Sequence, residues 1–161
     1  MPSYLPRLPK ENKPRSNQFD VVSFLRWSPF RGPVVNRIRE FLEYLDLTYL
    51  IGETTERRIV DGYRLGRCAL NVNQNTDLNI RQFEALAAGT PVMMTPAYDW
   101  NNSSFDELRP FTVLLDREVN LNSVQSSSER VKSINASAAA SIVLAKHQLI
   151  HRYISIAEKI L

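Results

Sequence analysis

Glu84 stands in the stretch of this sequence whose residue types and spacing best suggest chemistry. Residues 79–92 form a pattern of polar turn, helix, glycine and strand. The first turn of such a helix presents free backbone amides and a partial positive charge, which suits a diphosphate group. A carboxylate further along the helix, as at Glu84, could accept hydrogen bonds from ribose hydroxyls. The stretch therefore indicates a nucleotide site, although Glu84 could instead pair with Arg81 on the helix surface.

Two other sets of side chains could also carry chemistry. His147 and His151 are four residues apart, a spacing compatible with a metal pair on one helix face. No third ligand is evident, so we expect a packed or exposed helix there and no bound metal. Trp27 and Trp100 stand beside predicted loops, where each could stack on a base or sugar or cover an edge of the core.

The pattern of apolar residues predicts the scaffold that positions these groups. Short apolar runs alternate with segments of helical spacing, which is typical of a parallel sheet with helices on both faces. The expected strands are residues 19–25, 47–51, 68–72, 91–95 and 111–115, and the expected helices between them are residues 34–45, 56–65 and 78–88. The predicted fold class is α/β, a Rossmann-like parallel sheet of about five strands. Ligands bind such sheets beyond the carboxyl ends of the strands.

The last third of the sequence has helical spacing up to its end. Apolar residues from Val131 to Ile160 recur three or four positions apart, which predicts a long C-terminal helical segment, either unbroken or bent near Lys146. Ser126, Ser127 and Ser128 are candidates for its N-cap. An unbroken helix would leave part of its apolar stripe uncovered, so we expect contact with a second chain or another copy.

Positive charge is concentrated at the N-terminus. The formal net charge is +3, and residues 1–18 account for it with four Lys or Arg residues and one Glu. The same residues hold four of the nine prolines, which prevents a helix or a central strand. We expect residues 1–18 to be a proline-rich basic arm and residues 19–161 to be one domain. A domain without net charge argues against nucleic-acid binding.

The cysteine content and the apolar runs indicate in which compartment of the cell the protein is found. Cys68 is the only cysteine, so no internal disulfide can form. No apolar run approaches the roughly 20 residues that span a bilayer, and the N-terminus lacks the apolar core of a secretory signal. We therefore expect a cytoplasmic protein without a membrane span.

Residues 83–92 resemble a signature of retaining GT-B glycosyltransferases, a Glu-Ala pair followed by small residues, a glycine and a Pro-Val pair. The sequence is more similar still to the CgeB-like branch of these enzymes. The matching residues are Tyr63, Leu70, Asn71, Asn79, Arg81, Phe83 and Glu84. The resemblance covers about residues 19–161, and it implies the nucleotide-binding, C-terminal half of such an enzyme.

The resemblance implies roles for individual residues of the helix over 78–88. Glu84 matches the glutamate that holds the ribose of the donor. Asn79 and Arg81 match positions near the donor phosphates.

Four further residues are implied by the same resemblance. Gly89 and Thr90 match the turn that follows the helix. Arg26 and Arg31 lie in the predicted loop after the first strand, where the family often places basic groups for the diphosphate. These two arginines could instead be solvated loop residues.

The sequence also departs from the family. Thr76 stands where many members have a second acidic residue that touches the transferred sugar, and the neighbouring Asp77 could simply cap the next helix. The acceptor-binding domain is absent from the sequence. We therefore expect a glycosyltransferase-like protein that binds a nucleotide sugar, needs no metal or other cofactor, and transfers the sugar only with an acceptor domain from another chain. The alternative is a non-catalytic structural or assembly module derived from such a domain.

Overall fold

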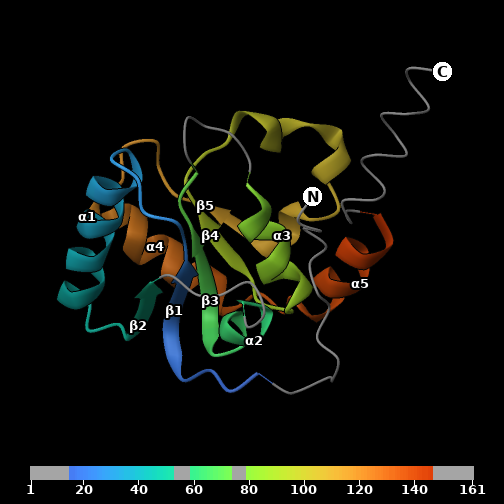
Figure 1. Cartoon of the computed structure of the whole chain (residues 1–161), viewed down its shortest axis with the longest axis horizontal. Coiled ribbons are helices and arrows are strands. Elements are labelled where there is room, and N and C mark those ends of the chain that lie inside the picture. Colours follow the sequence, from blue (N-terminus) through green and yellow to red (C-terminus); the bar gives the residue numbers. More distant parts are fainter. Residues whose placement is uncertain (1–14, 53–58, 74–78, 147–161) are drawn as a thin grey trace.

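The computed structural model describes residues 15–52, 59–73 and 79–146. It contains a five-stranded parallel sheet with helices on both faces (Figure 1), which confirms the α/β, Rossmann-like fold. The strands are β1 (Phe19–Phe24), β2 (Tyr49–Gly52), β3 (Gly66–Asn71), β4 (Val92–Met94) and β5 (Thr112–Leu114). All five expected strands are therefore present, with small shifts at their ends.

The direction of strand order reverses between β1 and β3. The sheet runs β2-β1-β3-β4-β5, and Val21 of β1 stands opposite both Tyr49 of β2 and Cys68 of β3. The chain thus moves outward from β1 to β2 and then returns to the other side of β1. In open parallel sheets, ligands bind at the carboxyl edge where the strand order reverses in this way.

The helices divide between the two faces of the sheet (Figure 1). They are α1 (Arg31–Tyr44), α2 (Ile59–Tyr63), α3 (Ile80–Ala87), α4 (Leu121–Lys132) and α5 (Ser137–Lys146). One core lies beneath α1 and α4, and the other lies beneath α2, α3 and α5. Because successive side chains of a strand point to opposite faces, Met93 belongs to the first core and Met94 to the second.

The first helix begins earlier than the sequence pattern predicts. Arg31 was expected in a loop, but it is the first residue of α1. The Ser28 hydroxyl accepts a hydrogen bond from the Arg31 backbone N–H at 3.2 Å. Pro33 does not prevent this early start, since the first turn of a helix has no use for its missing N–H. Arg31 therefore occupies a fixed position on a helix.

The C-terminal helical segment is two separate helices rather than one. Its first helix begins before the expected serines, because Asn120 is the N-cap and accepts a hydrogen bond from the Ser123 N–H at 2.9 Å. Ser126–Ser128 lie inside α4. The expected continuous helix is wrong across residues 133–136, where the Asn135 side chain accepts from the Ser137 N–H at 3.1 Å and α5 begins.

The two C-terminal helices pack on opposite faces of the sheet. Val131 of α4 lies in the core beneath α1, whereas Ala139 and Val143 of α5 lie in the core beneath α3. The chain therefore crosses from one face to the other between α4 and α5. The bend expected near Lys146 and all residues after it lie outside the described part of the chain.

The structure describes only the end of the predicted basic arm. Residues 15–18 precede β1 without regular secondary structure, and residues 1–14 lie outside the described part. Among the helices that the structure describes, none has the length and apolar character needed to cross a membrane.

Candidate functional site

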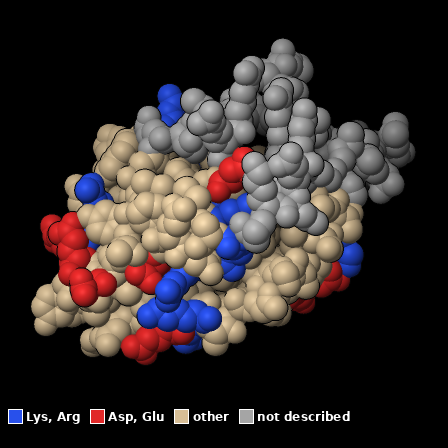
Figure 2. All heavy atoms as spheres, turned by 90° about the horizontal axis from the view of Figure 1, so that it is seen from below, with Lys and Arg blue, Asp and Glu red and all other residues tan. Residues whose placement is uncertain are grey.

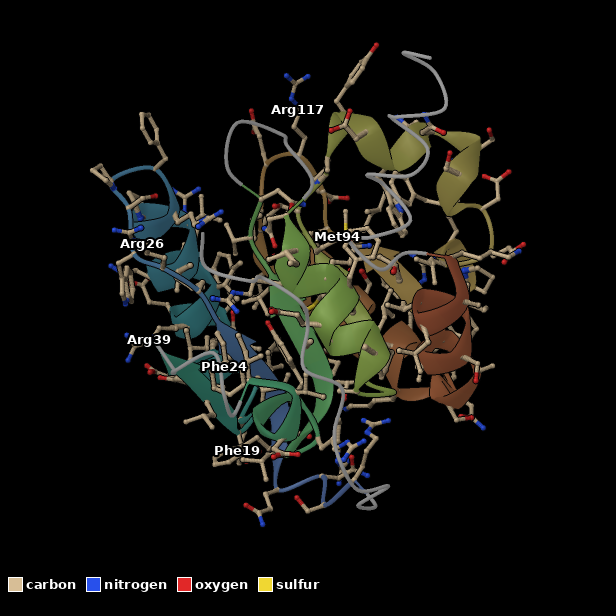
Figure 3. The ribbon with its side chains drawn as sticks, turned by 45° about the vertical axis from the view of Figure 1, so that its right-hand side comes forward. Phe19, Phe24, Arg26, Arg39, Met94 and Arg117 are labelled. Carbon is tan, nitrogen blue, oxygen red and sulfur yellow. The ribbon has the colours of Figure 1, made fainter. Side chains whose placement is uncertain are left out.

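The candidate site lies at the carboxyl edge of the sheet. Figure 3 shows β1 running upward from Phe19 to Phe24, with Arg26, Met94 and Arg117 at the end toward which the strands run. The loops after β1, β3 and β4 and the first turns of α1 and α3 meet at this edge. These segments carry the polar side chains described next.

Asn79 attaches the start of α3 to the end of β3. It is the N-cap of α3, and its Oδ1 accepts a hydrogen bond from the Arg81 N–H at 2.9 Å. Its Nδ2 donates to Oδ1 of Asn71 at 2.8 Å and to Oδ1 of Asn73 at 3.2 Å. The Asn79 amide therefore positions the helix. Thr76 and Asp77, the other residues considered near this turn, lie outside the described residues.

Asn73 extends the same network to β4. Its backbone N–H donates to Oγ1 of Thr95 at 2.8 Å, and its Nδ2 donates to the Thr95 carbonyl at 2.6 Å. Asn73 and Thr95 are not among the site residues that the sequence predicts. Their signal was available, because both are polar residues that directly follow buried strands at the ligand edge.

Glu84 forms an ion pair with Arg81. Nη1 of Arg81 lies 2.8 Å from Oε2 of Glu84, a contact between residues that neighbour each other on one helix face. The Glu84 side chain is 9% exposed and that of Arg81 is 28% exposed. The pairing considered as the alternative for Glu84 is therefore present, and it holds the carboxylate in one orientation.

Arg31 connects the loops that follow β1 and β3. Its Nε donates to the Val72 carbonyl at 3.1 Å, and its Nη1 donates to the Arg26 carbonyl at 3.3 Å. Burial lowers the pKa of Arg31, and the positive charge of Arg81 lowers it further. The charges of two guanidinium groups, one from α1 and one from α3, thus act on each other at the carboxyl edge, which gives this edge a positive potential.

The remaining predicted residues are more scattered. Arg26 is exposed in the loop after β1. Gly89 and Thr90 lie past the opposite end of α3, where Gly89 has a φ of +73° and the buried Thr90 hydroxyl donates to the Tyr63 carbonyl at 2.9 Å. The structure brings Arg31, Asn79, Arg81 and Glu84 together, and it places Gly89 and Thr90 away from them.

A large open pocket adjoins the asparagine network. Its volume is about 890 Å³. Its described lining comprises Phe30, Pro33, Val34, Arg37, Val72, Asn73, Thr95, Pro96, Ala97, Tyr98, Asn101, Arg117, Glu118 and Val119. Phe30 and Tyr98 are 67% and 82% exposed. None of the seven predicted site residues is among the described lining, but Asn73 belongs both to the pocket wall and to the network that holds α3.

Gln82 is a buried polar residue beside this network. Its side chain is fully buried, and neither its oxygen nor its nitrogen has a hydrogen-bond partner among the described residues. It lies in the first turn of α3, three residues after the N-cap Asn79. A buried amide without partners costs stability, and sequence patterning gave no indication of it.

The two tryptophans have different environments. Trp100 is buried and stacks on Phe105, with the ring centroids 5.4 Å apart. It covers the core, which was one of the two roles considered for it. Trp27 is partly exposed, at 41%, in the loop after β1.

Acidic, histidine and cysteine side chains do not form a metal cluster in the part of the chain that the structure describes. Within that part there is no group of three such residues that could hold a metal ion. His147 and His151 lie outside it.

The fold and the edge described above define a Rossmann-like α/β domain with a positively charged candidate site at the switch point of its sheet. One family model, described as glycosyl transferase-like, matches residues 15–158 and so includes every described residue. The chain belongs to this glycosyl transferase-like family. A comparison with curated proteins found no match.

Proposed function

We propose that this domain binds a nucleotide sugar at its carboxyl edge, as the donor-binding half of a GT-B glycosyltransferase of the CgeB-like branch. Family membership supports the glycosyltransferase part of this proposal. The observation that carries the rest is that Arg31, bonded to the carbonyls of Val72 and Arg26, and Arg81, at the start of α3, both lie at the switch point between β1 and β3 and their charges interact.

The diphosphate of the donor would bind between these two arginines. Two like charges held near each other repel, and the only described carboxylate paired with either of them is Glu84. An added diphosphate would neutralise the remaining charge and could accept several charge-assisted hydrogen bonds. The N-termini of α1 and α3 point toward the same edge and add the partial positive charge of each helix.

The ribose would bind to Glu84. Its contact with Arg81 fixes the orientation of the carboxylate, and the two oxygens of an ionised carboxylate can together accept up to about four hydrogen bonds. Ribose hydroxyls can donate to those positions while the phosphates contact Arg81. Asn79 would act through α3, as a residue that positions Arg81 and Glu84.

The rest of the donor would extend into the open pocket. Its volume of about 890 Å³ falls within the range of about 300–1,000 Å³ that is usual for small-molecule sites. Asn73 and Thr95 offer hydrogen-bonding groups on its wall, and the exposed rings of Phe30 and Tyr98 offer faces for stacking.

The contribution of this half to sugar transfer would be electrostatic. Arginines and helix N-termini would stabilise the charge that develops on the leaving diphosphate. We propose that the acceptor and the residue that orients it come from a second chain. The exposed aromatic residues Trp27, Phe30 and Tyr98 at this edge support such a contact.

Calorimetric titration with UDP-, GDP- and TDP-sugars tests the donor site. We expect saturable binding of at least one of them, and we expect Arg81→Met to weaken it by about tenfold or more, because a charged hydrogen bond is lost. Arg109→Met is the matched control, since Arg109 pairs with Asp106 at the same i,i+3 spacing and at 2.9 Å, but on the surface. No binding of any donor at millimolar concentration, or equal losses in the two variants, would contradict the proposal.

A further inference from the structure

A second, smaller cavity opens at the amino edge of the sheet. Its volume is about 260 Å³, and its described lining is Arg15, Asn17, Arg67, Val131, Lys132 and Ile134. These residues come from the segment before β1, the start of β3 and the end of α4. Figure 2 looks onto this edge from below and shows Lys and Arg side chains gathered near its middle. The cavity is thus separated from the candidate donor site by the length of the strands.

Among the described residues, only carbonyl groups accept hydrogen bonds from Arg15 in this cavity. Its Nη1 donates to the Gly89 carbonyl at 3.3 Å, and its Nη2 donates to the carbonyls of Gly66 at 2.8 Å and Arg67 at 2.6 Å. Its Nε is buried and has no acceptor in the described part of the chain. These contacts fix the guanidinium without neutralising it, and burial lowers the pKa of Arg15. The fold therefore bears the cost of a desolvated positive charge at this position.

The charges around the cavity do not balance within the described residues. Nε of Arg67 lies 3.6 Å from Oδ1 of Asp20. Burial alone would raise the pKa of Asp20, but hydrogen bonds from Thr48 and the charges of Arg67 and Lys132 outweigh it and leave that pKa lowered. Three cations, Arg15, Arg67 and Lys132, thus line the cavity, and the one described carboxylate paired with any of them is Asp20, which leaves two positive charges in excess.

We propose that this cavity binds a phosphate-class oxyanion, either free phosphate or the terminal phosphate of a larger molecule. A phosphate group carries about 1.5–2 negative charges at neutral pH, which offsets most of the excess. Guanidinium groups bind phosphate through charge-assisted hydrogen bonds. A water molecule occupies about 30 Å³ in the liquid, so the cavity has room for the anion with several waters. The bound anion joins the segment before β1 to the end of α4.

NMR titration of the isotope-labelled chain with inorganic phosphate and with pyrophosphate tests this site, with sodium chloride at equal ionic strength as the reference. We expect saturable shifts at the amides of Arg67 and Lys132 and at the Arg15 Nε–H, which then gains an acceptor. Tighter binding of pyrophosphate than of phosphate identifies the terminal phosphate of a larger molecule as the ligand. Equal or weaker binding identifies free phosphate.

Two variants of α4 provide the matched comparison. Lys132→Met removes a cation that lines the cavity, whereas Arg130→Met removes an exposed cation from the same last turn that does not line it. We expect phosphate affinity to fall by about fivefold or more in Lys132→Met and by less than about twofold in Arg130→Met. The affinity is taken from the shifts at the amino edge, so binding at the carboxyl edge does not contribute to it. Shifts that match those in chloride, equal effects of the two α4 variants, or shifts confined to the carboxyl edge would overturn the proposal.

Discussion

Arg81 and Glu84 form an ion pair of 2.8 Å in which the carboxylate is the more buried partner, with 9% of its side chain exposed against 28% for the arginine. The surface pair of Asp106 and Arg109 has the same spacing and nearly the same length, but its side chains are 57% and 43% exposed. Removal of its partner destabilises the fold far more for a buried charge than for an exposed one. Arg81 is thus constrained on one side by Glu84 and open to solvent on the other.

Glu84→Gln should separate ribose recognition from phosphate recognition. We expect nucleotide-sugar affinity to fall by about 1.5–3 kcal/mol, because hydrogen bonds from ribose to a charged acceptor are weakened. Affinity for inorganic pyrophosphate should be unchanged or higher, since a negative charge beside Arg81 is removed. Calorimetry on both ligands measures the difference, with the exposed Glu107→Gln as control. Equal losses for both ligands would show that the ribose role is misassigned.

Gln82→Met should stabilise the domain. The fully buried Gln82 amide has no hydrogen-bond partner among the residues that the structure describes, and methionine has a similar shape without the cost of desolvating an amide. We expect the free energy of unfolding to rise by about 1–3 kcal/mol in urea titrations. Gln125→Met on the exposed face of α4 is the control and should have little effect. A loss of stability in Gln82→Met would mean that the amide makes a favourable contact in solution.

Gly66→Ala should destabilise the start of β3. A Cβ at Gly66 would lie 2.5 Å and 2.8 Å from the two methyl groups of Val22 in the neighbouring strand. Relief of such a clash in a packed core costs about 1–3 kcal/mol. Gly52→Ala in β2 is the matched control, because a Cβ there meets nothing within 4 Å. Thermal unfolding of both variants should therefore show a lower midpoint for the Gly66 variant alone.

The buried thiol of Cys68 should make the free energy of unfolding fall at alkaline pH. Burial, and then the negative charge of Asp20, raise the pKa of the Cys68 thiol to about 12, and burial also raises the pKa of Tyr63. Both groups hold their protons more tightly in the folded state. Their contribution to the free energy of unfolding is complete below the pKa that each group has in the unfolded chain, about 8.5 for cysteine. It is lost as the pH rises toward the pKa of the same group in the folded state.

Urea unfolding at a series of alkaline pH values measures this loss. We expect the free energy of unfolding to fall from about pH 8.5 toward pH 12, and we expect a shallower fall in Cys68→Ala. The comparison uses slopes, so the packing change in the variant does not affect it. Identical slopes in the two proteins would show that Cys68 does not contribute.

Local signals made the centre of the fold predictable from sequence. The short apolar runs correspond to the five strands, because strands covered on both faces consist of continuous apolar residues. The end of α3 was equally clear, since Gly89 adopts the positive φ that ends many helices. Asn79, Arg81 and Glu84 follow from the same segment, so their proximity required no long-range information.

The parts that sequence did not predict depend on contacts between distant segments. Apolar spacing continues from Val131 into α5, but the chain reverses at Asn135 and the two helices cover opposite faces. Ala138, seven residues after Val131, lies on the apolar stripe that the sequence predicts, but it is exposed. The side of α5 that is buried therefore differs from the expected one. The bond from Arg31 to the Val72 carbonyl and the burial of Gln82 likewise arise only when the sheet is assembled.

The amides of Asn71, Asn73 and Asn79, with the Thr95 hydroxyl, attach α3 to the sheet through groups that do not ionise. Protonation and salt therefore leave these bonds unchanged, and the first turn of α3 keeps its position over a wide range of pH and ionic strength. A change in donor affinity with pH would then report the titration of the donor's phosphates. The position of α3 itself therefore adds no pH dependence to the measured affinity.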